Sequence, residues 1–342
     1  MKAAFFELES WEIPYIEERM KSMLGIDGCM MKEEKLEDAH IPSLQDTEIL
    51  SVFIYSRVTR EMMEKIPSLR LIVTRSTGYD HIDTAAAWEK GIKVANVPSY
   101  GENTVAEHAF ALLLALSRRV YPAVARTKDF NFSTVGLRGW DLKGKTIGIV
   151  GLGHIGRHVA RMAQGFEMKI LGFDPSADHE AMQAQGIESV PFERLLAESD
   201  VLTLHCPYTK TTHHFLNDSA FSKLKDGVYI INTARGGLID TQALVQALES
   251  KKVAGAGLDV LEEECEVKEE RQLASKHWND PKCDLKTMLA NHALAGRDDV
   301  IITPHNAWNS REAIERILAT TVENIKGYLA QAPVNIVNED II

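Results

Sequence analysis

KTIGIVGLGHIGRHVARMAQGFEMKILGFD, residues 145–174, is the segment around which this 342-residue chain is organised. Its first apolar run, residues 146–150, has the pattern of a strand that is buried on both faces. A GxGxxG turn follows, then apolar residues at helical spacing, and then a second apolar run, residues 169–173, that ends on Asp174. This succession of strand, glycine turn, helix, strand and terminal acid predicts a dinucleotide-binding unit.

Each glycine of the turn is expected to have its own task. Gly151 permits the tight turn, Gly153 lets the backbone approach a pyrophosphate, and Gly156 lets the helix close on the strand. The N-terminus of that helix offers unpaired N–H groups and a partial positive charge to the pyrophosphate. Asp174 is placed to accept hydrogen bonds from the adenosine ribose hydroxyls. A carboxylate there repels a 2′-phosphate, so the segment favours NAD over NADP.

Composition and charge narrow the class of protein. A chain of 342 residues favours two domains over one core. The net charge of −11 argues against nucleic acid or an anionic membrane surface as a partner. The four cysteines have no paired spacing, which is typical of a reducing compartment. The N-terminus has no signal-peptide pattern, and the longest apolar run, residues 109–116, is too short to span a bilayer. We therefore expect a cytoplasmic protein.

The segments on either side of the glycine turn predict how the chain divides. Residues 1–100 alternate strand-like and helix-like runs, as in the first part of a small substrate domain with a parallel sheet. Residues 101–305 hold further strands that end in polar residues or glycine, which is the pattern of one Rossmann-type NAD-binding domain. Residues 306–342 contain an amphipathic helix, over 311–329, that is expected to pack back on the first domain and complete it.

Two segments outside the glycine turn allow more than one interpretation. The turn at residues 75–80 could bind a carboxylate through the N–H groups that flank Gly78, or it could be a plain turn in which Asp80 caps the next helix. The helix at residues 104–120 is apolar on more than one face, so it is expected to be buried between domains or between subunits. His108 within it is predicted to be a structural histidine.

The polar stretch between Leu261 and Asp299 contains two cysteines and two histidines, which raises the question of a zinc site. Their separations of 12, 6 and 9 residues match no tight-pair ligand pattern, so we predict no metal and a surface excursion with some helix. The four residues are Cys265, His277, Cys283 and His292.

Seven motifs together resemble the D-isomer-specific 2-hydroxyacid dehydrogenase family, and they occur in the order of that family over nearly the whole chain. Tyr79, Tyr100 and Trp308 make the D-lactate dehydrogenases the most similar members. The motifs are RSTGYDHID, NVPSYGENTVAEH, GLGHIGRHVA, CPYTKTTHHFLN, INTARGGLIDTQAL, GAGLDVLEEE and VIITPHNAWNSREAI. The resemblance implies a Rossmann-type doubly wound domain inserted into a smaller flavodoxin-like α/β substrate domain. It also implies a homodimer and reversible hydride transfer between NADH and a short 2-oxo acid, with pyruvate and D-lactate as the leading pair.

The catalytic set of the family corresponds here to Arg235, Glu264 and His305. Reduction of a 2-oxo acid needs a proton for the carbonyl oxygen, and a histidine can deliver it near neutral pH for about 10²–10⁴-fold in rate. Glu264 would hydrogen-bond the other ring nitrogen of His305 and favour its protonated form. Arg235 would grip the carboxylate and the carbonyl with its planar fork.

The resemblance also implies which residues bind the cofactor and the substrate. The pyrophosphate loop would include His154 and Ile155, and the substrate carboxylate would meet the amides of Gly78 and Tyr79. The implied cofactor residues are Gly151, Gly153, His154, Ile155, Gly156, Asp174, Cys206, Pro207, Thr233, Ala234, Arg235 and Asp259. The implied substrate residues are Thr77, Gly78, Tyr79, Tyr100, Arg235 and Trp308.

Two departures from the family pattern leave alternatives open. Glu264 and His305 are 41 residues apart, so that the true partner of His305 could be Glu262 or Glu263. Gly101 and Glu102 stand where small-substrate members often have Ser-Pro, which concerns the shape of the substrate pocket.

The alternative functions are of two classes. A same-fold enzyme could reduce hydroxypyruvate or glyoxylate, or oxidise a phosphorylated serine precursor, for which Arg57, Arg60 and Arg75 could bind the phosphate. A protein of a different class could keep the fold as an NADH-sensing binding module, but it would have little need of Arg235 and His305 together.

Overall fold

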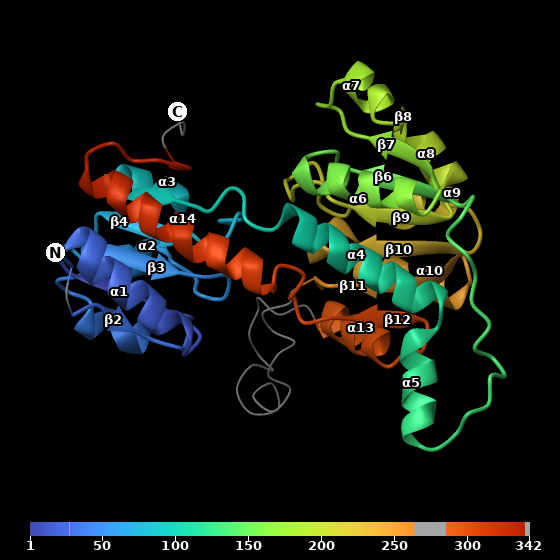
Figure 1. Cartoon of the computed structure of the whole chain (residues 1–342), viewed down its shortest axis with the longest axis horizontal. Helices are drawn as coiled ribbons and strands as arrows, with labels where there is room; N and C mark the ends of the chain where they lie inside the picture. Colours follow the sequence, from blue (N-terminus) through green and yellow to red (C-terminus); the bar gives the residue numbers. More distant parts are fainter. Residues whose placement is uncertain (27, 263–284, 339–342) are drawn as a thin grey trace. The chain divides into compact units, whose positions relative to one another are not determined.

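The computed structural model describes residues 1–26, 28–262 and 285–338, and these form two compact units (Figure 1). Unit 1 combines Met1–Gly101 with Ser310–Ile342, and unit 2 is Glu102–Asn309. Each unit has its own parallel sheet with helices packed against it. The predicted class, a doubly wound α/β domain inserted into a smaller α/β domain, is therefore confirmed.

The sheet of unit 1 has the strand order β2-β1-β3-β4-β5, with every pair parallel. This is the flavodoxin-like order, which was expected from the family resemblance. Its central strands are buried along their whole length, as a sheet covered on both faces requires. The strands are β1 (Ala3–Phe5), β2 (Met30–Met31), β3 (Ile49–Val52), β4 (Leu71–Thr74) and β5 (Lys93–Ala95).

The C-terminal helix completes unit 1. This helix, α14 (Arg311–Leu329), packs against α1 (Glu12–Leu24) and β4. Beyond it, the side chain of Asn338 accepts from the amide of Val94 at 3.0 Å and donates to the carbonyl of Ile92 at 2.9 Å. The other helices of unit 1 are the 3₁₀ helix η1 (Asp38–Ser43), α2 (Arg60–Glu64) and α3 (Thr84–Glu89).

The sheet of unit 2 has the strand order β12-β11-β10-β9-β6-β7-β8 and is parallel throughout. Counted from β6, the order is 3-2-1-4-5-6-7, the doubly wound order with its switch point between β6 and β9. The strands are β6 (Thr146–Val150), β7 (Lys169–Phe173), β8 (Glu188–Ser189), β9 (Val201–Leu204), β10 (Val228–Asn232), β11 (Val253–Leu258) and β12 (Val300–Ile302).

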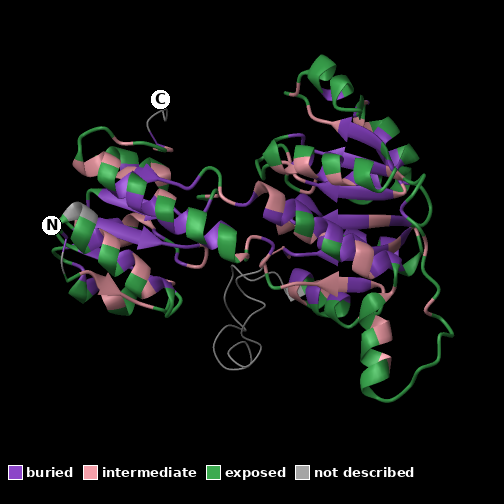
Figure 2. Ribbon diagram, in the orientation of Figure 1, coloured by how far each residue is buried: buried purple, intermediate pink, exposed green. Residues whose placement is uncertain are grey.

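Helices cover both faces of this sheet and enclose a separate apolar core on each (Figure 2). One face carries α4 (Glu102–Ser117) and α6 (His154–Gly165), and the other carries α8 (Phe192–Glu198), α9 (Asp218–Lys223) and α10 (Thr241–Glu249). The remaining helices of unit 2 are α5 (Val120–Lys128), α7 (His179–Ala184), the 3₁₀ helix η2 (Gly236–Leu238) and α13 (Leu285–Ala295). None of the described helices combines the length and the apolar character that a membrane crossing would need.

The apolar helix predicted at residues 104–120 is α4, and it is part of the core of unit 2. It packs against α6, β10 and β11, and Leu112, Leu113 and Leu116 are buried there. Its apolar faces are thus covered from within the same unit. A helix wedged between a sheet and a second helix needs apolar residues on more than one side, so this packing accounts for the pattern. The expectation that α4 is buried between domains or between subunits stays a prediction.

Candidate active site

The glycine turn lies between β6 and α6, at the switch point of the unit 2 sheet. Gly151 has φ +89°, and a Cβ there would lie 2.6 Å from the backbone nitrogen of Cys206. A Cβ on Gly156 would lie 2.1 Å from the carbonyl oxygen of Gly151. A Cβ on Gly153, by contrast, would meet nothing within 4 Å. The turn is therefore close-packed at its first and third glycines and open at the second, where a pyrophosphate would approach.

The N-terminus of α6 faces this open position. Gly153 is its N-cap residue, and His154 and Ile155 are the first residues of the helix. His154 is exposed and Ile155 is half-buried, so both remain accessible to a ligand. The turn is also held by Arg157, whose Nε donates to the carbonyl of Leu152 at 2.9 Å. The geometry suits an anion at the end of a 12-residue helix.

Asp174 follows the end of β7 and reaches back to the glycine turn. Its Oδ2 accepts from the amide of Leu152 at 2.8 Å, and its Oδ1 accepts from the amide and the hydroxyl of Ser176 at 2.9 and 2.8 Å. Burial alone would raise the pKa of Asp174, but these hydrogen bonds outweigh it and keep the pKa below the ordinary value. Asp174 is therefore an anionic acceptor beside the turn.

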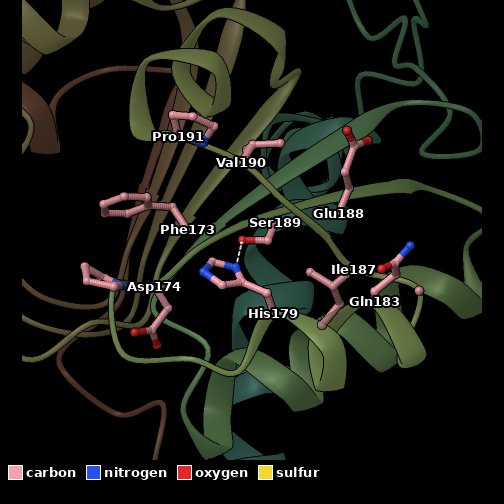
Figure 3. Close-up of a pocket in the computed structure, with 11 residues that line it drawn as sticks. Phe173, Asp174, His179, Gln183, Ile187, Glu188, Ser189, Val190 and Pro191 are labelled. Atoms are coloured by element: carbon pink, nitrogen blue, oxygen red, sulfur yellow. Dashed lines mark hydrogen bonds between the residues drawn. The ribbon is translucent and has the colours of Figure 1, made fainter.

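A pocket of about 790 Å³ adjoins Asp174 at the end of β7 (Figure 3). Phe173 and Pro191 contribute to its apolar wall, and the Nδ1 of His179 lies 2.6 Å from the hydroxyl of Ser189 on its polar side. An adenosine whose ribose was held by Asp174 would have this pocket beside it. Apolar surface with a few polar groups is what such a base requires.

The residues after β9 form the other wall of the switch point. Burial raises the pKa of the Cys206 thiol to about 11, so this cysteine is a neutral packing group at physiological pH. His205 precedes Cys206 and is half-buried. Desolvation lowers the pKa of its imidazole to about 3, so His205 is neutral, and it hydrogen-bonds the hydroxyl of Thr203 at 2.8 Å. Pro207 follows as an exposed residue.

The turn after β10 presents Thr233, Ala234 and Arg235. Asn232 at the end of the strand holds it, because its side chain accepts from the amide of Ala234 at 3.0 Å and donates to the carbonyl of Arg235 at 2.9 Å. Arg235 is half-buried, and its guanidinium donates to the carbonyl of Ala234 at 2.8 Å. A Cβ on Gly236 would lie 2.0 Å from the backbone of Leu261, so only glycine lets this turn approach the segment that follows β11.

These residues pass a test for an absent dinucleotide. Within the described part of the chain, the hydroxyl of Thr233 is buried and has no hydrogen-bond partner. A buried hydroxyl without a partner costs about 1–3 kcal/mol, which a polar ligand group would recover. Together with the open cradle at Gly153 and the carboxylate of Asp174, it fits NAD along the carboxyl edge of the sheet.

Asp259 and His305 follow the adjacent strands β11 and β12. Asp259 hydrogen-bonds the backbone of the turn that contains His305. The amide of His305 donates to the carbonyl of Asp259 at 2.8 Å, and the Asp259 carboxylate accepts from the amides of Asn306 at 3.0 Å and Ala307 at 2.9 Å. His305 is held at φ +52°, in the left-handed region. Trp308 closes the turn by donating from Nε1 to the carbonyl of His305 at 2.8 Å.

Glu264 lies outside the described residues, and so do Glu263, Cys265, His277 and Cys283. Glu262 is described, and its carboxylate is engaged elsewhere. Its Oε1 lies 2.5 Å from Nε2 of His214, and its Oε2 accepts from the hydroxyl of Thr241 at 2.9 Å. The carboxylate of Glu262 is thus committed to His214 and Thr241, away from His305.

In unit 1, the turn at residues 76–79 follows β4 at the carboxyl edge of the sheet. The hydroxyl of Ser76 donates to the carbonyl of Gly78 at 2.6 Å, and the side chain of Asn96 donates to the carbonyl of Thr77 at 2.8 Å. Within the described part of the chain, no acceptor engages the N–H groups of Gly78 and Tyr79. The turn thus offers two donors to an anion.

Tyr100 lies near the end of the first segment of unit 1, and its carbonyl accepts a hydrogen bond from Nε of Arg316. Tyr79 is 38 % exposed and Tyr100 is half-buried. Both rings therefore retain surface that a ligand could cover.

Of the three arginines proposed for a phosphate substrate, Arg57 is exposed, whereas Arg75 and Arg60 are engaged within unit 1. Arg75 is only 2 % exposed and donates to the carbonyls of Phe6 at 2.7 Å and Glu7 at 2.6 Å. Arg60 pairs with Glu89 at 2.7 Å. Arg75 is therefore unavailable to a ligand, contrary to the expectation from sequence.

Several residues with a part in this geometry were missed by sequence reasoning. Asn232 and Arg157 shape the two turns that would hold NAD, and both could have been noticed as polar residues within the motifs INTARGG and GLGHIGR. The anchoring of the His305 turn by Asp259 had no signal in the sequence, because it joins residues 44 to 48 positions apart.

Known proteins are similar to this chain over most of its length. Residues 110–307 match the model of the NAD binding domain of D-isomer specific 2-hydroxyacid dehydrogenases. The D-lactate dehydrogenase of Escherichia coli is 34 % identical over 330 residues, which cover 95 % of this chain and 96 % of the relative. The hydroxypyruvate reductase of Thermotoga maritima is 35 % identical over 313 residues, covering 91 % and 95 %.

A solved structure extends the similarity to three dimensions. The D-lactate dehydrogenase from Aquifex aeolicus, complexed with NAD and lactic acid, has a TM-score of 0.86 and 36 % identity. The match covers 98 % of this chain and 99 % of that one.

Proposed function

Because the chain belongs to the D-isomer-specific 2-hydroxyacid dehydrogenase family, an NAD-dependent family that acts on CH–OH groups, we propose that it interconverts pyruvate and D-lactate. The observation that carries this proposal is the order of three neighbouring strands. Arg235 follows β10, Asp259 follows β11 and His305 follows β12, and these strands lie side by side and parallel. The three residues therefore emerge at one edge of one sheet.

The residues have complementary tasks in this reaction. When bound, NADH supplies a hydride to the carbonyl carbon. His305 donates a proton to the carbonyl oxygen, so that the 2-oxo acid, NADH and one proton yield the 2-hydroxy acid and NAD⁺. Arg235 binds the substrate carboxylate and polarises the carbonyl. Glu264 orients His305 and favours its protonated form.

The remaining predicted residues bind the two ligands. Asp174 would hold the adenosine ribose, Thr233 and Ala234 would line the nicotinamide, and Asp259 would hold the carboxamide with the acceptor capacity left on its Oδ2. The amides of Gly78 and Tyr79 in unit 1 would bind the substrate carboxylate. Unit 1 is accordingly proposed as the substrate domain and unit 2 as the NAD-binding domain.

An unphosphorylated, short substrate is favoured over a phosphorylated one. Tyr79, Tyr100 and Trp308 would supply apolar surface. Of the three candidate arginines, Arg75 is buried and Arg60 pairs with Glu89, which leaves the exposed Arg57. A phosphate dianion would need cations that are free to reach it. Hydroxypyruvate and glyoxylate remain the alternatives within the fold, and one of the relatives is named for the first of them.

We also propose that the protein is a cytoplasmic homodimer, and α5 with the loop after it supports the second copy. Helix α5 has no buried residue, and Figure 1 shows it reaching beyond the sheet of unit 2. A nine-residue helix is marginal in water by itself, and α5 contacts α4, so a second copy would supply a further partner. The exposed side chains Tyr121 (62 %), Phe130 (87 %) and Phe132 (74 %) offer apolar surface to that partner. Sedimentation of Phe130→Ser/Phe132→Ser should give a monomer; a dimer would refute this interface.

The test of the function is NADH oxidation against pyruvate, 2-oxobutyrate, phenylpyruvate, hydroxypyruvate and glyoxylate, with the chirality of the product determined. We expect pyruvate to have the highest kcat/KM and to give D-lactate. His305→Gln should bind NADH normally and lose about 10²–10⁴-fold in turnover. An L-product, or a His305→Gln variant with near-normal kcat, would overturn the mechanism.

A further inference from the structure

His108 lies on α4, and its ring reaches the turn that carries His305. Its Nε2 is 3.0 Å from the hydroxyl of Thr303 and 3.3 Å from Oδ1 of Asp259. Helix α4 packs against both β11 and β12, whose ends carry these two partners. The imidazole therefore contacts the base of the His305 turn and not an arbitrary part of the core.

The hydrogens in this group can be assigned from the donors and acceptors available. The hydroxyl of Thr303 donates to Oδ1 of Asp259, so its single proton is already used. Toward His108 the same hydroxyl can only accept, and Asp259 as a carboxylate can also only accept. Nε2 of His108 must therefore carry a proton and donate to this pair.

Asp259 depends on its donors because it is fully buried. Its exposed fraction is 0 %, and burial by itself would raise its pKa. The hydrogen bonds from His108, Thr303 and the two turn amides outweigh that effect and lower the pKa. A buried carboxylate that loses a donor is costly, so removal of one donor weakens the whole arrangement.

The same carboxylate keeps His305 in place. The carboxylate accepts from the amides of Asn306 and Ala307, immediately after His305. The backbone carbonyl of Asp259 accepts from the amide of His305. A left-handed backbone at a residue other than glycine costs about 1–2 kcal/mol, and it persists only where the surroundings enforce it. The φ of +52° at His305 is thus sustained by Asp259.

We propose that His108 is a positioning residue for His305, acting through Asp259 and Thr303. It completes the donor set of the buried carboxylate, and the carboxylate in turn holds the His305 backbone at the angle from which the imidazole meets the substrate. This inference rests on the proposed function for its effect on rate. It assigns a role in turnover to a histidine that the sequence suggested was merely structural.

The test compares three substitutions at one position. His108→Gln keeps an amide N–H at about the reach of Nε2, whereas His108→Leu removes the donor and His108→Asn is too short to replace it. We expect the leucine and asparagine variants to lose about 10- to 100-fold in kcat, with the KM for the 2-oxo acid and the Kd for NADH within about threefold of wild type. The glutamine variant should recover most of the rate.

A second measurement reports on the turn directly. Amide hydrogen exchange over residues 303–307 should be at least about fivefold faster in His108→Leu than in the wild type, because the turn opens more often. Glu107→Gln, at an exposed position one residue earlier on α4, is the matched control and should leave both kcat and exchange within about twofold.

The outcomes separate this inference from the proposed function. If the folded leucine and asparagine variants keep kcat within about twofold and exchange is unchanged, or if glutamine is as damaging as leucine, the positioning role is refuted. If the leucine variant does not fold, the asparagine variant decides. If the wild type reduces none of the 2-oxo acids, the proposed function has failed, and the exchange measurement alone decides whether His108 holds the turn.

Discussion

Replacing Asp174 by alanine should change the preference between the two nicotinamide dinucleotides. The carboxylate lies beside the glycine turn and accepts from the amide of Leu152 and from the amide and hydroxyl of Ser176. An ionised carboxylate offers about four acceptor positions, so about one is left for a ribose hydroxyl, and a second opens when the Ser176 hydroxyl turns away. The structure therefore supports one or two charge-assisted hydrogen bonds to NADH.

The magnitude follows from these contacts. A hydrogen bond to a charged group contributes about 1.5–3 kcal/mol, so Asp174→Ala should weaken NADH by about 10- to 150-fold. A 2′-phosphate carries about −1.5 to −2 charges, and near a half-exposed carboxylate its repulsion is on the order of 1–2 kcal/mol after screening. Removing the carboxylate should tighten NADPH accordingly. The ratio of the two dissociation constants should move by on the order of 100-fold or more.

The ratio is the proper quantity because Asp174 also holds the glycine turn. Loss of the hydrogen bond from Leu152 would loosen that turn for both cofactors alike, and this effect cancels in the ratio. The pKa of Asp174 lies below its ordinary value, so the carboxylate is charged at any pH above that value. The contribution of Asp174 to NADH binding in the wild type should accordingly be constant from about pH 5 upward.

Fluorescence titration of NADH and NADPH against the wild type, Asp174→Ala and Ser176→Ala tests this reasoning. Ser176→Ala keeps the carboxylate and frees an acceptor position, so it should bind NADH as tightly as the wild type or up to about threefold more tightly. A ratio in Asp174→Ala that stays within about threefold of the wild type would refute the ribose role.

Three further predictions use the same structure. Gly151→Ala should destabilise the fold by about 2–4 kcal/mol in urea unfolding, because the backbone of residue 151 has a positive φ and the added Cβ would lie too close to the backbone of Cys206. Gly153→Ala should keep the stability of the wild type and lose NADH affinity; equal stability of the two variants would contradict this. Glu264→Gln should shift the pH profile of kcat more than Glu262→Gln does, and the reverse order would reassign the proposed partner of His305. The pKa of Asp259 is lowered in the folded state, so its carboxylate stabilises the fold above the unfolded pKa of about 3.9, and this stabilisation is lost as the pH falls through the folded-state pKa. In Asp259→Asn, Tm should therefore fall less steeply with decreasing pH in the acid range than it does in the wild type; an unchanged dependence of Tm on pH would refute this.

The family, the two sheets and the cofactor were within reach of the sequence because their signals are local. The GxGxxG turn, the apolar runs of four or five residues and the acid at position 174 each need only a few neighbouring residues to be recognised. The doubly wound and flavodoxin-like fold types then followed from the family resemblance. The long motifs, which run through nearly the whole chain, left little freedom for another fold.

Tertiary structure decided which charged and polar side chains are available for function. Arg75 reads as a cation beside a turn, yet it is buried and binds carbonyls 68 and 69 residues away. Glu262 reads as one of three equivalent acids, yet His214 and Thr241 engage it. Neither fact has a local pattern, because each depends on which loops the two sheets bring together.

For the helix at residues 104–120, the sequence predicted burial but not which part of the molecule covers it. Its apolar faces correctly predicted burial, but only the packing of α4 on the sheet and on α6 shows that unit 2 itself provides it. The sequence by itself determined that this chain binds NAD and belongs to its family. Only the fold brings His108 within hydrogen-bonding distance of Thr303, 195 residues away in the sequence, because two distant segments meet at the edge of one sheet.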